Sequence, residues 1–326
     1  MKMEVDPITN RTGSSSKINL YLHYLLKSNI YILCRYNNIM KIVTKKKGGK
    51  KYLYLKHSFR EGNRVLTKEK YLGLEIPKNI ENIISNFKKD VELELNKKLE
   101  LIKDNFQADW KRIPESARKK ELEEISIAFT YNTNAIEGST ITLEEAREII
   151  HDKISPNKPL KDVRETEAHS EVFLKMLGKE EEIKNKLLLN WHEDIFGMTK
   201  TDIAGKYRDY LVRVGHYLAP DWQDVKKLMN EIIEYIKKNK DKINPVELSA
   251  RAHYRFEQVH PFGDGNGRIG RLLTNYMLWH KGYPMLIIEY KKRSSYYKAF
   301  HGDEEYFVRY FIRRYLTVHK KRFVLA

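Results

Sequence analysis

The stretch His260-Pro-Phe-Gly-Asp-Gly-Asn-Gly-Arg-Ile-Gly-Arg271 decides the fold and the chemistry that we expect of this chain of 326 residues. Its glycines let the main chain turn tightly and approach a ligand closely. Apolar side chains then recur at helical spacing from Ile269 to Met277, which predicts a helix that begins near Gly267. The first turn of such a helix presents unpaired N–H groups and the positive end of the helix dipole. This part of the chain therefore predicts a binding site for an anion such as phosphate.

The side chains of the same stretch agree with a phosphate ligand. Arg268 and Arg271 are three residues apart, so they share one face of the predicted helix, and guanidinium groups match phosphate oxygens in a bidentate geometry. Asp264 offers a hard oxygen ligand, which suffices for Mg²⁺ when substrate phosphates supply further ligands. His260 has a side chain suited to proton transfer near neutral pH. A base, a metal ligand, an anion site and two cations are the parts that phosphoryl-group transfer needs.

The stretch resembles the signature of the Fic family, His-x-Phe-x-(Asp/Glu)-Gly-Asn-Gly-Arg-x-x-Arg. All eight fixed positions are matched, by His260, Phe262, Asp264, Gly265, Asn266, Gly267, Arg268 and Arg271. The resemblance extends over about residues 80–320 and implies a mainly α-helical fold, the Fic helical bundle with a short β-hairpin flap. It also implies an enzyme that transfers AMP from ATP to a Ser, Thr or Tyr hydroxyl of a protein and releases pyrophosphate.

The resemblance assigns a role to each residue of the stretch. His260 would take the proton of the target hydroxyl, and Asp264 would hold Mg²⁺ between the α- and β-phosphates. The phosphate chain would be surrounded by the main chain of two glycines, an asparagine amide and two guanidinium groups, of which the last binds the γ-phosphate: Gly265, Gly267, Asn266, Arg268 and Arg271. ATP and Mg²⁺ are thus the expected substrate and cofactor.

A second motif lies upstream of the first. Thr133-Asn-Ala-Ile-Glu-Gly138 is similar to the inhibitory motif of the family, (Ser/Thr)-x-x-x-Glu-(Gly/Asn), in the class that carries it amino-terminal to the catalytic stretch. Glu137 would then pair with Arg271 and withhold this cation from the γ-phosphate, because two anions compete for one guanidinium. By themselves these residues also describe a helix end capped by Gly138, and both interpretations can hold. In some relatives this glutamate supports the removal of AMP from a target, so a reverse or bifunctional enzyme is an alternative.

The helical pattern is interrupted between Lys206 and Gly215. Apolar and polar side chains alternate there, which predicts a β-hairpin that contains Tyr210, Leu211, Val212, Arg213 and Val214. An exposed strand edge binds extended peptides through main-chain hydrogen bonds, so we expect a flap that docks the target protein. A simple connector is the alternative. Farther along, Tyr296 and Tyr297 stand where the family often places residues beside the adenine.

Residues 1–75 differ from the rest of the chain in charge. They hold 16 of the 61 lysines and arginines but 5 of the 44 acidic residues, so they carry +11 of the formal net charge of +17. Alternation in Tyr52–Ser58 and in Arg64–Tyr71, with Gly62 and Asn63 between them, predicts a β-hairpin. This positive charge is the basis for an alternative to the enzyme. The chain would then be a binding protein whose basic arm recruits nucleic acid or an acidic partner, with a vestigial Fic scaffold.

The sequence therefore predicts two parts, a basic segment over residues 1–75 and a Fic domain over residues 76–326. The Fic domain would contain an inhibitory helix at about 116–138 and a catalytic core at about 160–320, with a capping box at Thr142-Leu-Glu-Glu145. Helices are expected at 163–177, 186–197, 222–239, 246–258, 267–281 and 304–319.

The remaining expectations concern location and partners. Cys34 is the single cysteine, which excludes an intrachain disulfide and suits a reducing compartment. The amino-terminal residues show no secretory pattern, and no early stretch is long and apolar enough to span a bilayer. We therefore expect a cytoplasmic protein with no membrane partner. The family resemblance adds a homodimer and self-modification to the expected partners, whereas the target protein is not named by the sequence.

Overall fold

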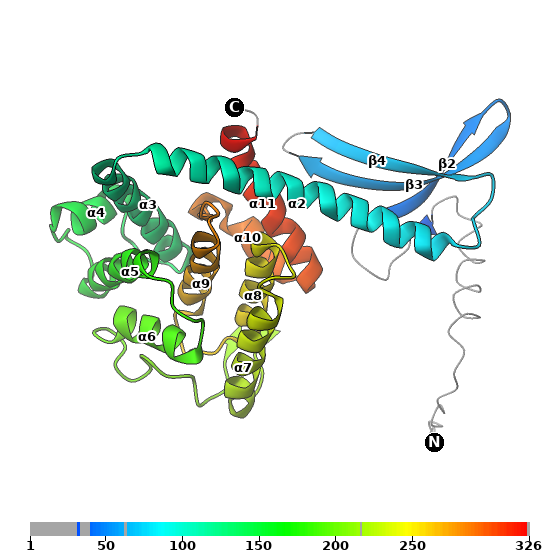
Figure 1. The fold of residues 1–326 in the computed structure, drawn as a ribbon. Coiled ribbons are helices and arrows are strands. Elements are labelled where there is room, and N and C mark those ends of the chain that lie inside the picture. The colour runs from blue at the N-terminus through cyan, green and yellow to red at the C-terminus, as the bar shows by residue number, and fades with distance from the viewer. Residues whose placement is uncertain (1–30, 33–39, 62–63, 216, 325–326) are drawn as a thin grey trace, which may run out of the picture. The chain divides into compact units, whose positions relative to one another are not determined.

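The computed structural model describes residues 31–32, 40–61, 64–215 and 217–324 (Figure 1). They form two compact units, one that ends at Leu93 and one that begins at Glu94. Each unit has its own hydrophobic core, as described below.

The first unit contains an antiparallel sheet. Its strands are β1 (Tyr31–Ile32), β2 (Met40–Lys47), β3 (Lys50–Glu61) and β4 (Arg64–Gly73), and they lie side by side in chain order. The pairing of β3 with β4 runs up to the last pair before the turn, Glu61 opposite Arg64, and it confirms the hairpin predicted there. The turn residues of that prediction, 62 and 63, lie outside the described residues.

One face of this sheet packs on the start of a long helix, α2 (Ile80–Arg112). Ile42 and Leu55 are fully buried there, together with Phe87 of the helix. Because these apolar side chains belong to one core, the first unit includes the first turns of α2. The division at Leu93 thus lies inside this helix, whereas the sequence pattern placed it at residue 75.

The second unit is helical, which confirms the predicted mainly α fold. After α2 it contains α3 (Glu115–Ile136), α4 (Leu143–Arg147), the π-helical turn η2 (Glu148–Asp152), α5 (Leu160–Gly178), α6 (Asn185–Phe196), α7 (Trp222–Asn239), α8 (Pro245–Val259), α9 (Asn266–His280), the 3₁₀ turn η3 (Tyr290–Lys292), α10 (Arg293–Phe300) and α11 (Glu304–Phe323). The expected helices agree with these within a few residues, and the capping box at Thr142 and Glu145 is present. Helix α10 was not predicted, because its eight residues show no apolar repeat.

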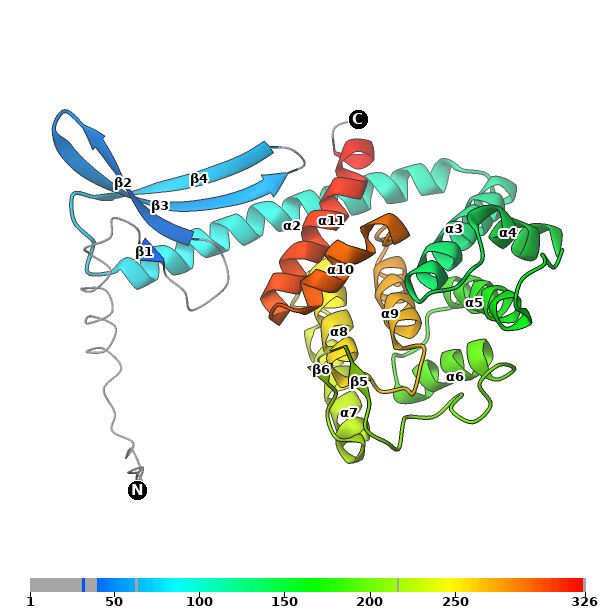
Figure 2. The ribbon, with the colours of Figure 1, turned by 180° about the vertical axis from the view of Figure 1, so that it is seen from behind.

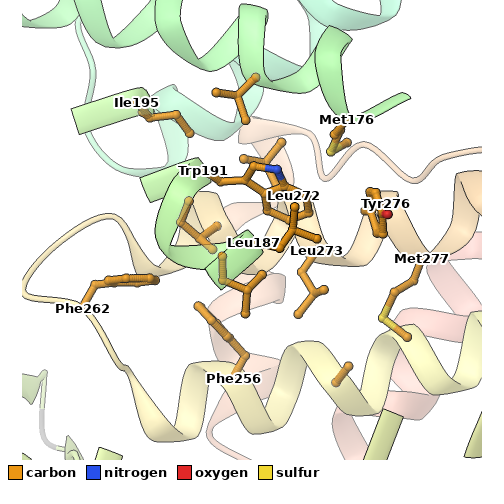
Figure 3. Close-up of a cluster of buried hydrophobic side chains, with 14 of the residues drawn as sticks. Met176, Leu187, Trp191, Ile195, Phe256, Phe262, Leu272, Leu273, Tyr276 and Met277 are labelled. Carbon is orange, nitrogen blue, oxygen red and sulfur yellow. The ribbon is translucent and has the colours of Figure 1, made fainter. Parts of the chain in front are cut away.

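The main core of this unit forms around α9, where α6 and α8 pack against it (Figure 3). Leu272 and Leu273 of α9 are fully buried, in one cluster with Trp191 of α6 and Phe256 of α8. Burial of each such side chain contributes about 2 kcal/mol of hydrophobic free energy. These contacts hold α9 in place, and its first turn belongs to the stretch that carries the predicted site.

The predicted flap is shorter than the sequence pattern suggested. Two strands of two residues each, β5 (Arg213–Val214) and β6 (Tyr217–Leu218), pair in antiparallel fashion (Figure 2). Tyr210, Leu211 and Val212 precede them in irregular chain, so the predicted strand over these residues is wrong. The physical reason is a set of contacts with the end of α8, described below, which engages this part of the main chain in place of a strand partner.

None of the helices in the described part of the chain is both long enough and apolar enough to cross a membrane.

Candidate active site

The decisive stretch forms a loop between α8 and α9. Helix α8 ends at Val259, and His260 follows in the left-handed conformation, with φ of 49°. The loop is closed by the Asn266 amide, which accepts a hydrogen bond from the main-chain N–H of Phe262 (2.8 Å) and donates one to its carbonyl (2.9 Å). Asn266 therefore shapes the loop, and its expected direct contact with phosphate stays a prediction.

Two glycines of the loop are required by close neighbours. Gly265 has φ of 80°, which favours glycine, and a side chain there would collide with the ring of Phe196. A side chain at Gly267 would collide with the carboxylate of Glu137. The carboxylate of the upstream motif thus lies directly at the first turn of α9, where N–H groups and the helix dipole favour an anion.

Asp264 lies at the edge of the site in a network of charges. Its Oδ2 is 3.1 Å from the ammonium group of Lys200, and its Oδ1 is 4.0 Å from Arg268. Although burial acts in the opposite direction, these two cations hold the pKa of Asp264 below its ordinary value. The carboxylate is therefore ionised at neutral pH, and half of its side-chain surface is exposed.

A buried carboxylate organises both cations. Glu165 of α5 pairs with Arg268 and, at 2.7 Å, with Lys200, and it also accepts a hydrogen bond from the hydroxyl of Thr199 (2.9 Å). The guanidinium group of Arg268 also lies over the ring of Phe196. Glu165 pairs with this guanidinium group and the ring of Phe196 covers one of its faces, so Arg268 is held in place before any ligand binds.

His192 supports the loop from α6. The main-chain N–H of Gly205 donates to its Nδ1 (3.1 Å), so Nε2 carries the proton and donates to the carbonyl of Asp264 (3.0 Å). Burial lowers the pKa of His192 to about 4, so the ring stays neutral. Phe262 stacks on this ring with centroids 3.9 Å apart. These contacts give His192 a structural role in supporting the loop.

His260 stands at the end of α8 with a mostly buried ring. Burial lowers its pKa below the ordinary value, although the main chain of Glu257 and the carboxylate of Glu137 oppose the shift. A neutral imidazole at neutral pH is the form that accepts a proton.

The buried Arg208 fixes the main chain around His260. Its guanidinium group donates to the carbonyls of His260 (2.9 Å), Tyr210 (2.8 Å) and Pro220 (2.7 Å). Its own N–H donates to the carbonyl of Pro261 (2.9 Å). These bonds join the chain before β5 to the loop and explain why that chain is not a strand.

Arg271 is buried and lies against the upstream motif. Its Nη2 is 2.7 Å from the carboxylate of Glu137, and its Nε donates to the hydroxyl of Thr133 (2.6 Å). Glu137 is the C-cap residue of α3, and Gly138 follows with φ of 91°. The structure therefore contains both the glutamate–arginine contact that the family resemblance implies and the glycine at the helix end.

The two tyrosines expected beside the adenine differ in exposure. Tyr296 is buried, and its hydroxyl lies 2.7 Å from Nε2 of His253 and 3.4 Å from Nη1 of Arg271. Tyr297 is 42% exposed, and its hydroxyl donates to the carbonyl of Ile136. The position of Tyr296 favours a role in supporting Arg271 over contact with the adenine of a nucleotide. Adenine contact stays a prediction for Tyr297.

The flap lies close to the loop. A side chain at Gly263 would collide with the hydroxyl of Tyr210, and the hydroxyl of Tyr217 donates to the carbonyl of Gln258 at the end of α8 (2.8 Å). Leu211, Val214 and Leu218 are exposed. Thus the short hairpin and the chain before it lie beside the loop, and the docking of a target there stays a prediction.

Four residues of the site were missed by the sequence analysis: Glu165, Lys200, Arg208 and Glu257. The sequence offered a signal for Glu165 alone. It is spaced by four residues from His169 and by eight from Phe173, which places a glutamate on the buried face of α5. Lys200 and Arg208 lie in irregular chain, where spacing carries no information on contacts.

Comparison with known proteins agrees with this geometry. Residues 182–278 match the model of the Fic/DOC family. The chain is 34% identical over 205 residues to the protein adenylyltransferase Fic of Nematostella vectensis, and 32% identical over 212 residues to the protein adenylyltransferase fic-1 of Caenorhabditis elegans. These matches cover 60% of this chain but 48% and 41% of the relatives, so the chain spans less than half the length of these curated relatives.

Solved structures show the same arrangement of helices. A structure of residues 134–508 of Fic-1 from C. elegans is 26% identical, with a TM-score of 0.61, and the match covers 75% of this chain and 76% of that one. A Fic domain containing signaling protein from Bacteroides thetaiotaomicron is 25% identical, with a TM-score of 0.59, and the match covers 68% and 96%. The loop, the helix that follows it and these matches together show that this chain contains a region similar to the Fic/DOC family.

Proposed function

We propose that this chain transfers AMP from ATP to a hydroxyl group of a protein and that Glu137 restrains the reaction. The observation that carries the proposal is the gathering of His260, Asp264, Arg268 and Arg271 around the first turn of α9. A proton acceptor, a carboxylate and two buried cations there face a helix dipole that favours phosphate. The names of the related adenylyltransferases support the same reaction.

The reaction requires one proton transfer and one exchange at phosphorus. Nε2 of His260 takes the proton of the target hydroxyl, and the hydroxyl oxygen forms a bond to the α-phosphorus. The bond between the α-phosphorus and the oxygen that bridges to the β-phosphate breaks, and pyrophosphate leaves with its electrons. Arg268 and the N–H groups at the start of α9 would stabilise negative charge on the phosphates.

The donor set fits a metal ion that arrives with the nucleotide. Among the described residues, no group of three or more His, Cys, Asp or Glu side chains could hold a metal ion. Asp264 supplies one ionised, half-exposed carboxylate, and Mg²⁺ is commonly held by one or two carboxylates together with substrate phosphates. When bound, Mg²⁺ would neutralise charge on the phosphates, with Asp264 as its ligand from this chain.

The restraint follows from the contacts of Arg271. This guanidinium group is engaged by Glu137 and Thr133, so a γ-phosphate has to displace the carboxylate to reach it. The motif lies amino-terminal to the loop, as in the class of the family with an amino-terminal inhibitory helix. A restrained enzyme would hold ATP weakly or in an unproductive position. The same carboxylate near His260 could orient a water molecule, so removal of AMP from a modified target is the alternative direction of the reaction.

The test uses ATP with a radioactive label at the α- or the γ-phosphorus. We expect α-label to enter protein with Glu137→Gly, far less with the wild type, and none with Glu137→Gly/His260→Ala. The γ-label should stay in solution in all cases, because pyrophosphate leaves. Incorporation of γ-label would indicate phosphorylation, and the absence of any label in all variants would reject transfer from ATP. A previously modified target would then test the reverse reaction.

A second function is favoured by the sheet of the first unit. Three pairs of lysines lie directly opposite one another on β2 and β3: Lys41 and Lys56, Lys46 and Lys51, and Lys47 and Lys50. Like charges in such positions destabilise a sheet, so their presence favours a polyanionic partner. Tyr52, Tyr54 and Tyr71 lie near one another beside them, and tyrosine rings stack on bases. We propose that this sheet binds nucleic acid while the loop carries the transferase activity.

A further inference from the structure

Glu257, in the last turn of α8, carries a carboxyl group that the proposed reaction does not use. Its side chain is 14% exposed, and its Oε1 has no hydrogen-bond partner among the described residues. A side chain at Gly270 of α9 would come within 2.9 Å of this oxygen, so the carboxyl group lies between α8 and α9. Buried polar atoms without a partner are rare in folded proteins and cost free energy, so this one requires an explanation.

Nδ1 of His253, which also borders Gly270, has no partner among the described residues, and neither has Nδ1 of His260. The His260 atom lies 3.7 Å from Oε2 of Glu257, and a movement of less than 1 Å would bring the two atoms within hydrogen-bond distance. The position of His260 itself is fixed, because its N–H donates to the carbonyl of Phe256 and its carbonyl accepts from Arg208. With Nδ1 buried beside Glu257, Nε2 is the nitrogen that is left for a substrate.

We propose that Glu257 is a positioning residue that accepts a hydrogen bond from Nδ1–H of His260 and thereby keeps Nε2 free to take a proton. A neutral imidazole carries a single N–H, and the partner of one ring nitrogen decides which of the two nitrogens holds the proton. With the proton on Nε2 the ring could not act as a base toward the target hydroxyl. The inference rests on the proposed function for the role of Nε2.

The groups around Glu257 decide its charge. Burial raises the pKa of Glu257 to about 8, Arg271 of α9 opposes this shift, and Glu137 at the end of α3 adds to it. His253, one turn earlier on α8, is kept neutral by burial, which lowers its pKa to about 3. At neutral pH Glu257 is therefore mostly an uncharged acid, and its carbonyl oxygen is the acceptor. Glutamine has the same shape and the same acceptor, so Glu257→Gln is the conservative replacement.

The experiment compares Glu257→Gln with Glu257→Leu in the full chain that carries Glu137→Gly. Nitrogen NMR of histidine-labelled protein, with His260→Ala to assign the signals, reports which nitrogen of His260 carries the proton. We expect the Nδ1–H form in the parent and in the glutamine variant, and a mixed or Nε2–H form in the leucine variant. For AMP transfer, kcat should stay within about threefold in the glutamine variant and fall about 100-fold in the leucine variant, with KM for ATP unchanged.

A control and a second variant keep these outcomes decisive. Glu247→Leu makes the same change at the other end of α8, where Glu247 pairs with Arg251, and it should leave His260 and kcat unchanged. Glu257→Met serves if the leucine variant does not fold, and the stoichiometry of ATP binding counts the intact sites.

Two results would overturn the proposal: an unchanged tautomer in the leucine and methionine variants, or an equal loss with glutamine and leucine. If no variant transfers AMP, the proposed function fails, and the tautomer of His260 still decides the contact with Glu257.

Discussion

The ionisable side chains of the site lie at different depths, and depth together with neighbouring charge decides which of them are charged. Asp264 is half exposed and next to two cations, so it is ionised. His260 is mostly buried and stays neutral at neutral pH. Arg271 keeps its charge although it is buried, because Glu137 and Thr133 engage it. A neutral base beside an ionised carboxylate and paired cations is the charge pattern that transfer to a hydroxyl needs.

The pH dependence expected for the proposed AMP transfer follows from His260. The base must be unprotonated, and its pKa in the folded protein lies below the ordinary 6.5. In Glu137→Gly the pKa should be lower still, because the carboxylate of Glu137 raises it. We expect kcat/KM to be constant above about pH 7 and to fall as the pH drops through this lowered pKa. Initial rates across buffers of equal ionic strength measure it, and a midpoint above 6.5 would contradict a buried His260 as the base.

Removal of Glu137 should change stability and nucleotide affinity together. In Glu137→Gly, Arg271 loses its carboxylate partner but keeps Thr133, and the ion pair is partly exposed, so we expect a loss of about 1–2 kcal/mol. ATP should stabilise the variant more than the wild type, because in the variant the γ-phosphate takes the place of the missing carboxylate. Thermal unfolding with and without ATP measures both effects. Equal shifts on addition of ATP would argue against competition for Arg271, and Glu137→Gln, which keeps the shape, should give an intermediate shift.

At the scale of elements, the end of α8, the start of α9 and the flap form one connected group. Arg208 joins the chain before β5 to the carbonyl of His260, and His192 of α6 holds the carbonyl of Asp264. The main chain of the loop is therefore positioned by side chains from two other segments. Such support places the reacting groups before a substrate binds.

Substitution of Arg208 should weaken this group. In Arg208→Leu, the partly buried carbonyls of His260, Tyr210 and Pro220 lose their donor, and each unpaired group costs about 1–3 kcal/mol when water cannot replace it. We expect a loss of at least about 2 kcal/mol in urea unfolding and faster amide exchange in residues 213–218. Arg208→Lys should recover little, because one ammonium group cannot reach all three carbonyls. An unchanged midpoint in both variants would show that the flap is held by other contacts.

A separate prediction concerns the binding of a target protein at the flap. The N–H of Ala219 donates to the carbonyl of Val212, so by the alternation of an antiparallel pair the N–H of Arg213 points to the outer edge. If the target adds a strand at this edge, Arg213→Pro should reduce labelling of other proteins in a lysate about tenfold, while Arg213→Ala, which keeps the N–H, should change it little. Self-labelling is the internal reference. Equal effects of proline and alanine would indicate that the side chain, and not the main chain, contacts the target.

At the scale of the whole molecule, charge is divided between the two units. The strands and turns over residues 40–73 hold nine lysines and two arginines against two glutamates. The loop between α8 and α9 lies in the other unit. A change on the sheet should therefore affect a nucleic-acid partner without changing the chemistry of the loop.

This division is tested by reversing charges at the hairpin between β2 and β3. We expect the full chain to bind single-stranded nucleic acid with an affinity that falls steeply with salt. Replacing Lys46, Lys47, Lys50 and Lys51 by glutamate should abolish this binding and leave AMP transfer unchanged. Gel-shift and labelling assays on the same preparations measure the two effects. Binding that survives the four substitutions would assign it elsewhere, and no binding by the wild type would leave the sheet to a different acidic partner.

The sequence by itself determined most of the helices, one hairpin of the sheet and the two motifs. The capping box, the helices and the hairpin of β3 and β4 depend on local patterns, in which each residue's neighbours along the chain decide its conformation. His260, Asp264 and Arg271 were recognisable because twelve consecutive residues carry them. The motif from Thr133 to Gly138 was equally local, so its presence, although not its effect, was visible in the chain.

Only the tertiary structure decided which groups support these residues. Glu165 lies 103 positions from Arg268, and Arg208 lies 52 positions from His260, so no spacing along the chain could reveal either contact. The strand expected at Tyr210 failed for the same reason, because Arg208 engages that main chain through tertiary contacts that override the alternating pattern. The carboxyl group of Glu257 came to face His260 because α8 ends in a left-handed residue, and helix packing buried both. Burial and charge depend on what the fold brings together, and the order of residues alone does not state this.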